Sequence, residues 1–208
     1  MTSLKGKTVV ITGASSGIGK AAAIEFADKG CNVVLAARRA DKLAELCEHI
    51  RGFNKDCIYV ETDVTQERQV AKLFDEAEEK FGKVDILVNS AGRGLHCELD
   101  RITNDQWAGV IETNLTSVFL CSREAVGRMK AKRMKGCIVT VSSIAGRFGA
   151  PGYSAYCASK HAVTGFCKSI KWELRKYGIK VSTIHPARVD TEFFDTYAKR
   201  PGRAQMLS

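Results

Sequence analysis

The sequence lacks any long hydrophobic run. No apolar stretch among its 208 residues approaches the roughly eighteen residues that span a membrane. The N-terminal segment is charged, contains glycine and lacks the apolar core of a signal peptide. These absences argue against a membrane protein and predict a cytoplasmic one.

Paired cysteine motifs are also missing. The eight cysteines are scattered, none forms a CxxC pair, and several fall inside expected helices or strands. This distribution favours reduced thiols over a disulfide framework or a zinc site, so we expect no structural metal.

The chain has no linker, internal repeat or low-complexity stretch that would divide it. With 45% hydrophobic residues, its 208 residues are enough for one α/β domain with a substantial core. We therefore predict a single domain over residues 1–208.

Short apolar runs alternate with helical segments along the whole chain. We expect strands at 7–12, 32–37, 57–60, 84–88, 136–141 and 179–184, and helices at 17–29, 40–51, 66–81, 103–132 and 155–176. This alternation predicts βαβ units and a Rossmann-like, doubly wound parallel sheet. In such a sheet the ligand binds beyond the carboxyl ends of the strands.

A glycine-rich turn joins the first expected strand to the first helix. Gly13, Gly17 and Gly19 belong to the run TGASSGIG at 12–19. Glycines let the backbone approach a pyrophosphate closely, while the helix N-terminus supplies free N–H groups and positive dipole. The spacing departs from the usual GxGxxG, and a plain tight turn is the alternative.

Tyr156 and Lys160 lie four residues apart in the run YCASK at 156–160. On a helix they share one face, so the lysine ammonium can favour the ionised phenol and lower its pKa. The pair then predicts a proton donor and acceptor. An exposed amphipathic pair is the alternative.

Together these motifs resemble the short-chain dehydrogenase/reductase family, in the subgroup marked by TGxxxGxG and YxxxK. Within it, the chain resembles the 3-oxoacyl-carrier-protein reductases. The run NSAG at 89–92 resembles the family's NNAG, with Ser90 for the second asparagine. The run PARVDT at 186–191 resembles PGxVxT, with Ala187 for glycine. Ser143, thirteen residues before Tyr156, and Asn114 match the family's catalytic serine and helix asparagine.

The resemblance implies a catalytic group of Asn114, Ser143, Tyr156 and Lys160. Tyr156 would donate its proton to a substrate carbonyl oxygen, which Ser143 would hold. Lys160 would hold ribose hydroxyls, and Asn114 would support a water-mediated proton path behind the lysine. The alternatives are that Ser143 caps a strand end and that Asn114 satisfies buried backbone.

The resemblance also implies a cofactor site. Its expected residues are Gly13, Ser15, Ser16, Gly17, Ile18, Gly19, Arg38, Arg39, Asp63, Asn89, Ala91, Gly92, Tyr156, Lys160, Pro186, Val189 and Thr191. Asp63 would contact the adenine, with a helix-capping role as the alternative.

The end of the second expected strand indicates NADP (NADPH) as the cofactor. NAD-selective sites place a carboxylate there to bind the ribose 2′-hydroxyl. This chain has Ala37 at that position, followed by Arg38 and Arg39. A guanidinium forms charge-assisted bonds to a 2′-phosphate, although a solvent-facing arginine pair is the alternative.

We therefore predict a single dinucleotide-binding and catalytic domain that transfers a hydride between NADP(H) and a carbonyl or alcohol substrate, as a 3-oxoacyl or general carbonyl reductase does. The alternative is a non-catalytic dinucleotide-binding or regulatory protein that retains the fold.

Partners are less clearly indicated. The net charge of +9 is concentrated at 128–135, at Lys168, Lys171, Arg175 and Lys176, and near 199–200. A solvated helix face is the expected reading, an acidic acyl carrier protein is the alternative, and we expect no nucleic acid. The resemblance implies a homodimer or tetramer built on the two long helices. Family members continue with one more helix and an edge strand, so we expect a truncated chain with an exposed sheet edge, with a natural short form as the alternative.

Overall fold

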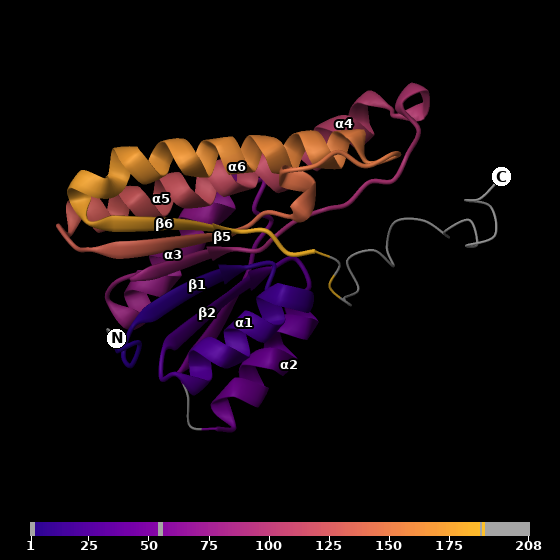
Figure 1. The fold of residues 1–208 in the computed structure, drawn as a ribbon. Coiled ribbons are helices and arrows are strands. Elements are labelled where there is room, and N and C mark those ends of the chain that lie inside the picture. The colour runs from indigo at the N-terminus through magenta and orange to yellow at the C-terminus, as the bar shows by residue number, and fades with distance from the viewer. Residues whose placement is uncertain (1–2, 54–55, 188, 190–208) are drawn as a thin grey trace.

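The computed structural model describes residues 3–53, 56–187 and 189, which form one sheet with helices on both faces (Figure 1). The strands are β1 Thr8–Thr12, β2 Asn32–Ala37, β3 Cys57–Glu61, β4 Ile86–Asn89, β5 Gly136–Val141 and β6 Ile179–Ile184. Their order is β3-β2-β1-β4-β5-β6, and every pairing is parallel. The predicted Rossmann-like, doubly wound sheet is therefore confirmed.

Helices cover the two faces of the sheet as separate groups (Figure 1). On one side lie α1 Gly17–Asp28 and α2 Ala40–Arg51. On the other side lie α3 Glu67–Phe81, α5 Ser117–Ala131 and α6 Ser154–Leu174. Shorter helical segments are α4 Asn104–Ile111, η1 Leu99–Arg101, η2 Glu112–Thr116, η3 Ile144–Gly146 and η4 Arg175–Tyr177.

The core follows from the period of two in the central strand. Successive side chains point to opposite faces, so Val9 and Ile11 pack with α1 and α2, and Val10 packs with α3 and α5. All five residues of β1 are buried. A strand buried on both faces requires a continuous apolar run, which is the pattern found in the sequence.

The predicted helix 103–132 is one helical path, but it is not one regular α-helix. It consists of α4, the wide π-turn η2 and α5. Such turns occur mostly as single insertions within α-helices and often at functional sites. Here the turn holds Asn114, which is fully buried and bonded to the loop after β4.

The predicted start of the fourth strand was two residues early. Asp85 precedes β4, and its carboxylate accepts bonds from Lys7 Nζ at 2.8 Å and from the Thr8 N–H at 3.1 Å. The Asp85 backbone N–H also donates to the Thr8 carbonyl oxygen at 2.9 Å, so the chain already contacts β1 one residue before the regular strand begins at Ile86.

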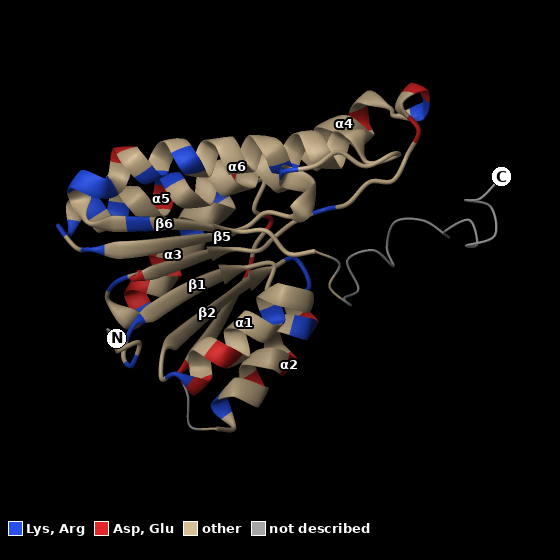
Figure 2. Cartoon of the chain, viewed as in Figure 1, with Lys and Arg blue, Asp and Glu red and all other residues tan. Residues whose placement is uncertain are grey.

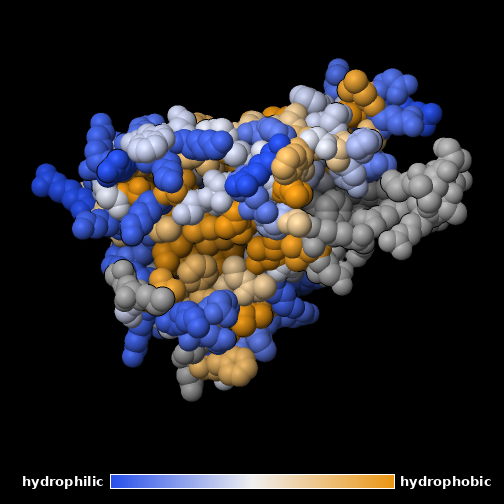
Figure 3. Space-filling model, viewed as in Figure 1, coloured by the Kyte–Doolittle hydropathy of each residue, from blue (hydrophilic) through white to orange (hydrophobic). Residues whose placement is uncertain are grey.

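Part of the sheet has apolar surface exposed on the α1 side. Figure 3 shows this surface between the α6 layer and the α1–α2 layer. Cys137 and Val139 of β5 are only partly buried there. Among the described strands, β3 and β6 are the edges.

The basic residues gather at the ends of α5 and α6 that lie away from the carboxyl ends of the strands (Figure 2). Arg128 is bonded to Asp75, Glu78 and Glu124 at 2.7, 2.9 and 2.7 Å. Part of this basic region therefore belongs to an ion-pair network between α3 and α5.

Within the described part of the chain, every helix is too short or too polar to cross a bilayer. The same residues contain no group of three or more His, Cys, Asp or Glu side chains that could hold a metal ion. All eight cysteines are free thiols.

Candidate active site

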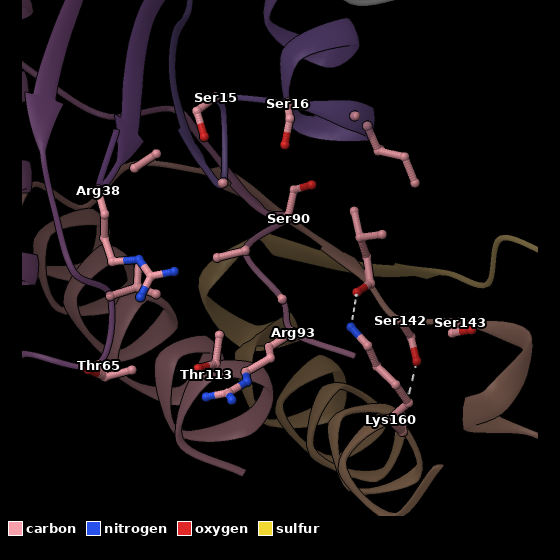
Figure 4. Close-up of a pocket in the computed structure, with 18 of the residues that line it drawn as sticks. Ser15, Ser16, Arg38, Thr65, Ser90, Arg93, Thr113, Ser142, Ser143 and Lys160 are labelled. Carbon is pink, nitrogen blue, oxygen red and sulfur yellow. Dashed lines mark hydrogen bonds between the residues drawn. The ribbon is translucent and has the colours of Figure 1, made fainter. Parts of the chain in front are cut away.

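A cavity of about 770 Å³ opens at the carboxyl ends of the strands. Segments that follow all six strands contribute to its wall, as expected for a parallel sheet whose connections all emerge at one edge. Figure 4 shows polar and charged side chains entering it from β1, β2, β4, β5 and α6.

The glycine turn forms one wall of the cavity through close backbone contact. Gly13 has φ +67°, and a Cβ there would lie 2.7 Å from Ala91 Cα. A Cβ on Gly19 would lie 2.3 Å from the Gly13 carbonyl oxygen. Thr12 Oγ1 accepts the N–H groups of Ser90 and Ala91 at 3.2 and 3.3 Å. These contacts join the turn to the loop after β4 and leave no room for side chains.

The predicted cofactor residues of this turn divide into two groups. Ser15, Ser16, Gly17 and Ile18 line the cavity together with Gly13. Gly19 lies behind them and serves the packing of the turn against α1.

The two arginines after β2 differ in the direction and partners of their side chains. Arg38 points into the open space (Figure 4). Arg39 donates from Nε and Nη2 to Ser15 Oγ at 3.1 and 2.9 Å, so it is tied to the glycine turn. Ala37 also lines the cavity, at the position where a carboxylate would favour NAD.

Asp63 lines the same end of the cavity. Its Oδ1 accepts the backbone N–H of Thr65 at 3.0 Å and the Thr65 hydroxyl at 2.8 Å. The carboxylate therefore organises its own loop and remains on the cavity wall. It does not cap α3 as the alternative supposed, because the N-cap residue of that helix is Gln66.

Three candidate catalytic side chains meet at the opposite end. Tyr156 and Lys160, both buried, project from α6, and Ser143 follows β5. The Tyr156 hydroxyl shares a hydrogen bond with Ser143. Lys160 Nζ donates to the Val141 carbonyl oxygen at 3.0 Å (Figure 4). It also lies 5.7 Å from the centroid of the Tyr156 ring.

Burial dominates the protonation of this group. It raises the pKa of Tyr156, and the hydrogen bond with Ser143 opposes that rise. Burial lowers the pKa of Lys160 to about 8. The prediction that Lys160 lowers the pKa of Tyr156 is therefore wrong for this structure, because the helical spacing says nothing about desolvation.

Asn114 lies behind the cavity rather than in its wall. Its Oδ1 accepts the Arg93 N–H at 2.6 Å, and its Nδ2 donates to the Arg93 carbonyl at 2.8 Å and to Ser159 Oγ at 2.9 Å. These bonds match the alternative in which Asn114 satisfies buried backbone, and they tie the loop after β4 to α6.

The remaining predicted residues are also placed. Ala91, Gly92, Pro186 and Val189 line the cavity. Asn89 is buried outside it, where Nδ2 donates to Ser122 Oγ at 3.2 Å. Thr191 lies outside the described residues.

Several cavity residues were missed by the sequence analysis. They are Thr62, Val64, Thr65, Arg93, Gly109, Glu112, Thr113 and Val141 as wall residues. The position of Arg93 directly after NSAG could have indicated its place, since neighbouring residues were assigned there. Gly109, Glu112 and Thr113 could not be found from local pattern, because they reach the cavity only through the packing of α4 and η2.

Comparison with known proteins agrees with this geometry. The model of the short chain dehydrogenase family matches residues 7–201. The NADP-dependent (R)-specific alcohol dehydrogenase of Lentilactobacillus kefiri is 37% identical, over 99% of this chain and 81% of that protein. The 3-oxoacyl-[acyl-carrier-protein] reductase of Synechocystis is 34% identical, over 97% of this chain and 81% of that protein.

A solved structure is similarly close. It is a short chain dehydrogenase/reductase from Burkholderia phymatum in complex with NAD. It superposes with a TM-score of 0.91 at 34% identity, covering 99% of this chain and 77% of that one.

Proposed function

This chain belongs to the short-chain dehydrogenase family, and we propose that it is an oxidoreductase that transfers a hydride between NADP(H) and a carbonyl or alcohol substrate. One observation carries the proposal. A single cavity joins the glycine turn and the arginines after β2 at one end to Ser143, Tyr156 and Lys160 at the other.

The residues present fit a dinucleotide. The turn from Gly13 to Ile18 leads into the N-terminus of α1, where free N–H groups and the helix dipole favour a pyrophosphate. The missing Cβ atoms of Gly13 and Gly19 keep this turn compact. Asp63, Ala91 and Gly92 would bound the adenosine, and Pro186 and Val189 would bound the nicotinamide. A bound nicotinamide supplies or accepts the hydride.

The side chains at the catalytic end would bind the substrate oxygen, transfer the proton and hold the ribose. Ser143 would donate a hydrogen bond to the substrate oxygen and hold it beside Tyr156. Tyr156 would give its proton to that oxygen during reduction and recover one during alcohol oxidation. Its raised pKa keeps the phenol protonated at neutral pH, which suits proton donation. Lys160 would hold ribose hydroxyls and resupply the proton, while Asn114 would keep the wall behind it in place.

NADP is the cofactor we propose, because the cavity has arginines where NAD-selective sites have a carboxylate. Because Ala37 has no carboxylate, nothing at that position repels a 2′-phosphate, and the Arg38 guanidinium would bind it by charge-assisted hydrogen bonds. The NADP-dependent alcohol dehydrogenase of Lentilactobacillus kefiri, a relative of this chain, supports this choice.

The substrate we propose is a carbonyl compound of the kind that a general carbonyl or 3-oxoacyl reductase accepts. The 3-oxoacyl-[acyl-carrier-protein] reductase of Synechocystis supports a 3-oxoacyl group on an acyl carrier protein as one candidate.

The test is spectrophotometric consumption of NADPH with a panel of ketones, aldehydes and 3-oxoacyl thioesters, alongside direct measurement of NADPH binding. Turnover that depends on substrate supports the proposal. Tight NADPH binding without turnover on any carbonyl compound would favour the non-catalytic alternative.

A further inference from the structure

Arg93 lines the cavity, yet no sequence motif gives it a task. Figure 4 shows its side chain leaving the loop after β4 and turning away from Lys160, toward the end that Arg38 enters. We infer that Arg93 is a second cation for the phosphate on the adenosine ribose and so helps to determine the preference for NADP. This inference rests on the proposed function.

Two hydrogen bonds hold the backbone of Arg93 in place. Asn114 bonds both its N–H, at 2.6 Å, and its carbonyl, at 2.8 Å, and Asn114 is itself completely buried. A third bond, to Ser159 Oγ, ties Asn114 to α6. These bonds fix the backbone of Arg93, and therefore the point at which its side chain enters the cavity.

The tip of Arg93 occupies space that a glycine provides. A Cβ on Gly109 of α4 would lie 2.7 Å from Arg93 Nη1. Glycine is a poor helix former, and at this position it lets the guanidinium lie against the helix backbone. An alanine there would displace the guanidinium without removing its charge.

The charges at this end favour an anion. Arg38, Arg39 and Arg93 line the wall with the carboxylates of Asp63 and Glu112. A phosphate monoester carries nearly two negative charges at neutral pH, and guanidinium groups remain charged and match its geometry with paired donors. Arg38 follows β2 and Arg93 follows β4, so the two guanidinium groups enter the cavity from different loops. A purely structural role beside Glu112 is the competing explanation.

The test compares affinities for phosphorylated and unphosphorylated ligands. Calorimetry measures the binding of NADPH, NADH, adenosine 2′,5′-bisphosphate and AMP to the wild type, Arg93→Gln and Arg93→Lys. We expect Arg93→Gln to weaken NADPH and the bisphosphate about tenfold, or about 1.4 kcal/mol, and to change NADH and AMP less than twofold. Arg93→Lys keeps the charge but loses the paired donors, so its loss should be intermediate.

Two further variants separate this effect from others. Arg175→Gln removes the same charge from an exposed position near the start of β6, at the far end of the sheet, and should change no affinity. Gly109→Ala retains Arg93 but displaces its tip, and it should lower the NADPH to NADH preference several-fold.

The outcomes are distinguishable. Equal loss of both cofactors in Arg93→Gln, or an unchanged preference, would overturn the inference and leave the proposed function standing. A wild-type protein that binds neither cofactor would contradict the proposed function itself. One that binds NADH as tightly as NADPH would contradict both the NADP assignment and the role of Arg93.

Discussion

Lys160 Nζ donates a hydrogen bond to the carbonyl oxygen of Val141 across 3.0 Å, from a side chain that is only 4% exposed. The bond joins α6 to Val141 at the end of β5, two residues before Ser143. It places the ammonium at the floor of the catalytic end of the cavity, where burying the positive charge has a free-energy cost. Burial lowers the pKa of Lys160 to about 8, well below the value near 10.4 of an unfolded chain.

This difference predicts how stability depends on pH. Below pH 8 both states hold the proton, and the folded state bears the full cost of the buried charge. From about pH 8 to 10 the folded state has lost the proton that the unfolded state keeps, so Lys160 makes stability rise with pH. Its slope should approach about 1.4 kcal/mol per pH unit.

Urea unfolding of the wild type and Lys160→Met between pH 7 and 10 measures this contribution. The difference between the two curves isolates Lys160, because the other titrating groups are common to both proteins. The variant should lose the rise between pH 8 and 10. Parallel curves would show that Lys160 titrates normally in the folded state.

Tyr156→Phe should abolish carbonyl reduction, with a loss of at least about 10²–10⁴-fold, because it removes the proposed proton donor. Affinity for NADPH should be nearly unchanged, since the substitution deletes one hydroxyl and keeps the ring. Stopped assays of NADPH consumption and a binding titration measure the two effects separately. Near-normal turnover would contradict the proposed mechanism.

The sequence was sufficient for the sheet because its signals are local. Apolar runs such as Val9, Val10 and Ile11 reveal a strand buried on both faces, and the alternation of strands and helices determines a parallel topology. The glycine turn and its neighbours were also found, because a turn with positive φ and close backbone contacts requires glycine, which the sequence shows directly. The start of β4 was placed two residues early, and the bonds of Asp85 to Lys7 and Thr8 join segments far apart in the chain, which a local pattern does not reveal.

The catalytic end was less accessible to sequence reasoning. The pairing of Tyr156 with Lys160 follows from helical spacing, but their pKa values depend on burial by distant segments. The π-turn at Asn114 and the place of Arg93 depend on one another through tertiary hydrogen bonds. No local pattern contains that information.

Gly19→Ala should destabilise the fold by about 1–3 kcal/mol, because its Cβ would meet the Gly13 carbonyl oxygen at 2.3 Å and force the turn apart. NADPH affinity should fall with it, since the turn is the proposed pyrophosphate site. Gly127→Ala is the matched control, because a Cβ at this exposed position in α5 meets nothing within 4 Å. That change should stabilise by about 0.5–1 kcal/mol. Equal effects of the two substitutions in chemical denaturation would contradict the steric argument.

We also predict a homodimer built on α5 and α6, as the family resemblance implies. Phe119 of α5 and Trp172 of α6 are 41% and 69% exposed in the single chain. Phe119 also packs edge-on against Phe166, with 6.4 Å between the ring centroids, so the aromatic surface spans both helices. Light scattering at micromolar concentration should report twice the chain mass, and Phe119→Glu should shift it toward the monomer. A monomeric wild type would count against this interface.

The last prediction concerns cofactor choice, which depends on the residues after β2. Ala37 lines the cavity without a carboxylate, and Arg38 points into it. Replacing Ala37 with Asp and Arg38 with Ser should supply an acceptor for the ribose 2′-hydroxyl, repel a 2′-phosphate and remove an attractive charge.

Each of these effects acts on the difference between the cofactors, so the NADPH to NADH preference should fall by at least about 10²-fold, which corresponds to about 2.7 kcal/mol. Arg175→Ser is the matched control, because it removes an exposed arginine near the start of β6, at the end of the sheet remote from the cavity. Titrations of both cofactors against the double variant, the control and the wild type measure the shift. A wild-type protein that binds NADH more tightly than NADPH would overturn the assignment, and an unchanged ratio in the double variant would show that Arg38 does not recognise the phosphate.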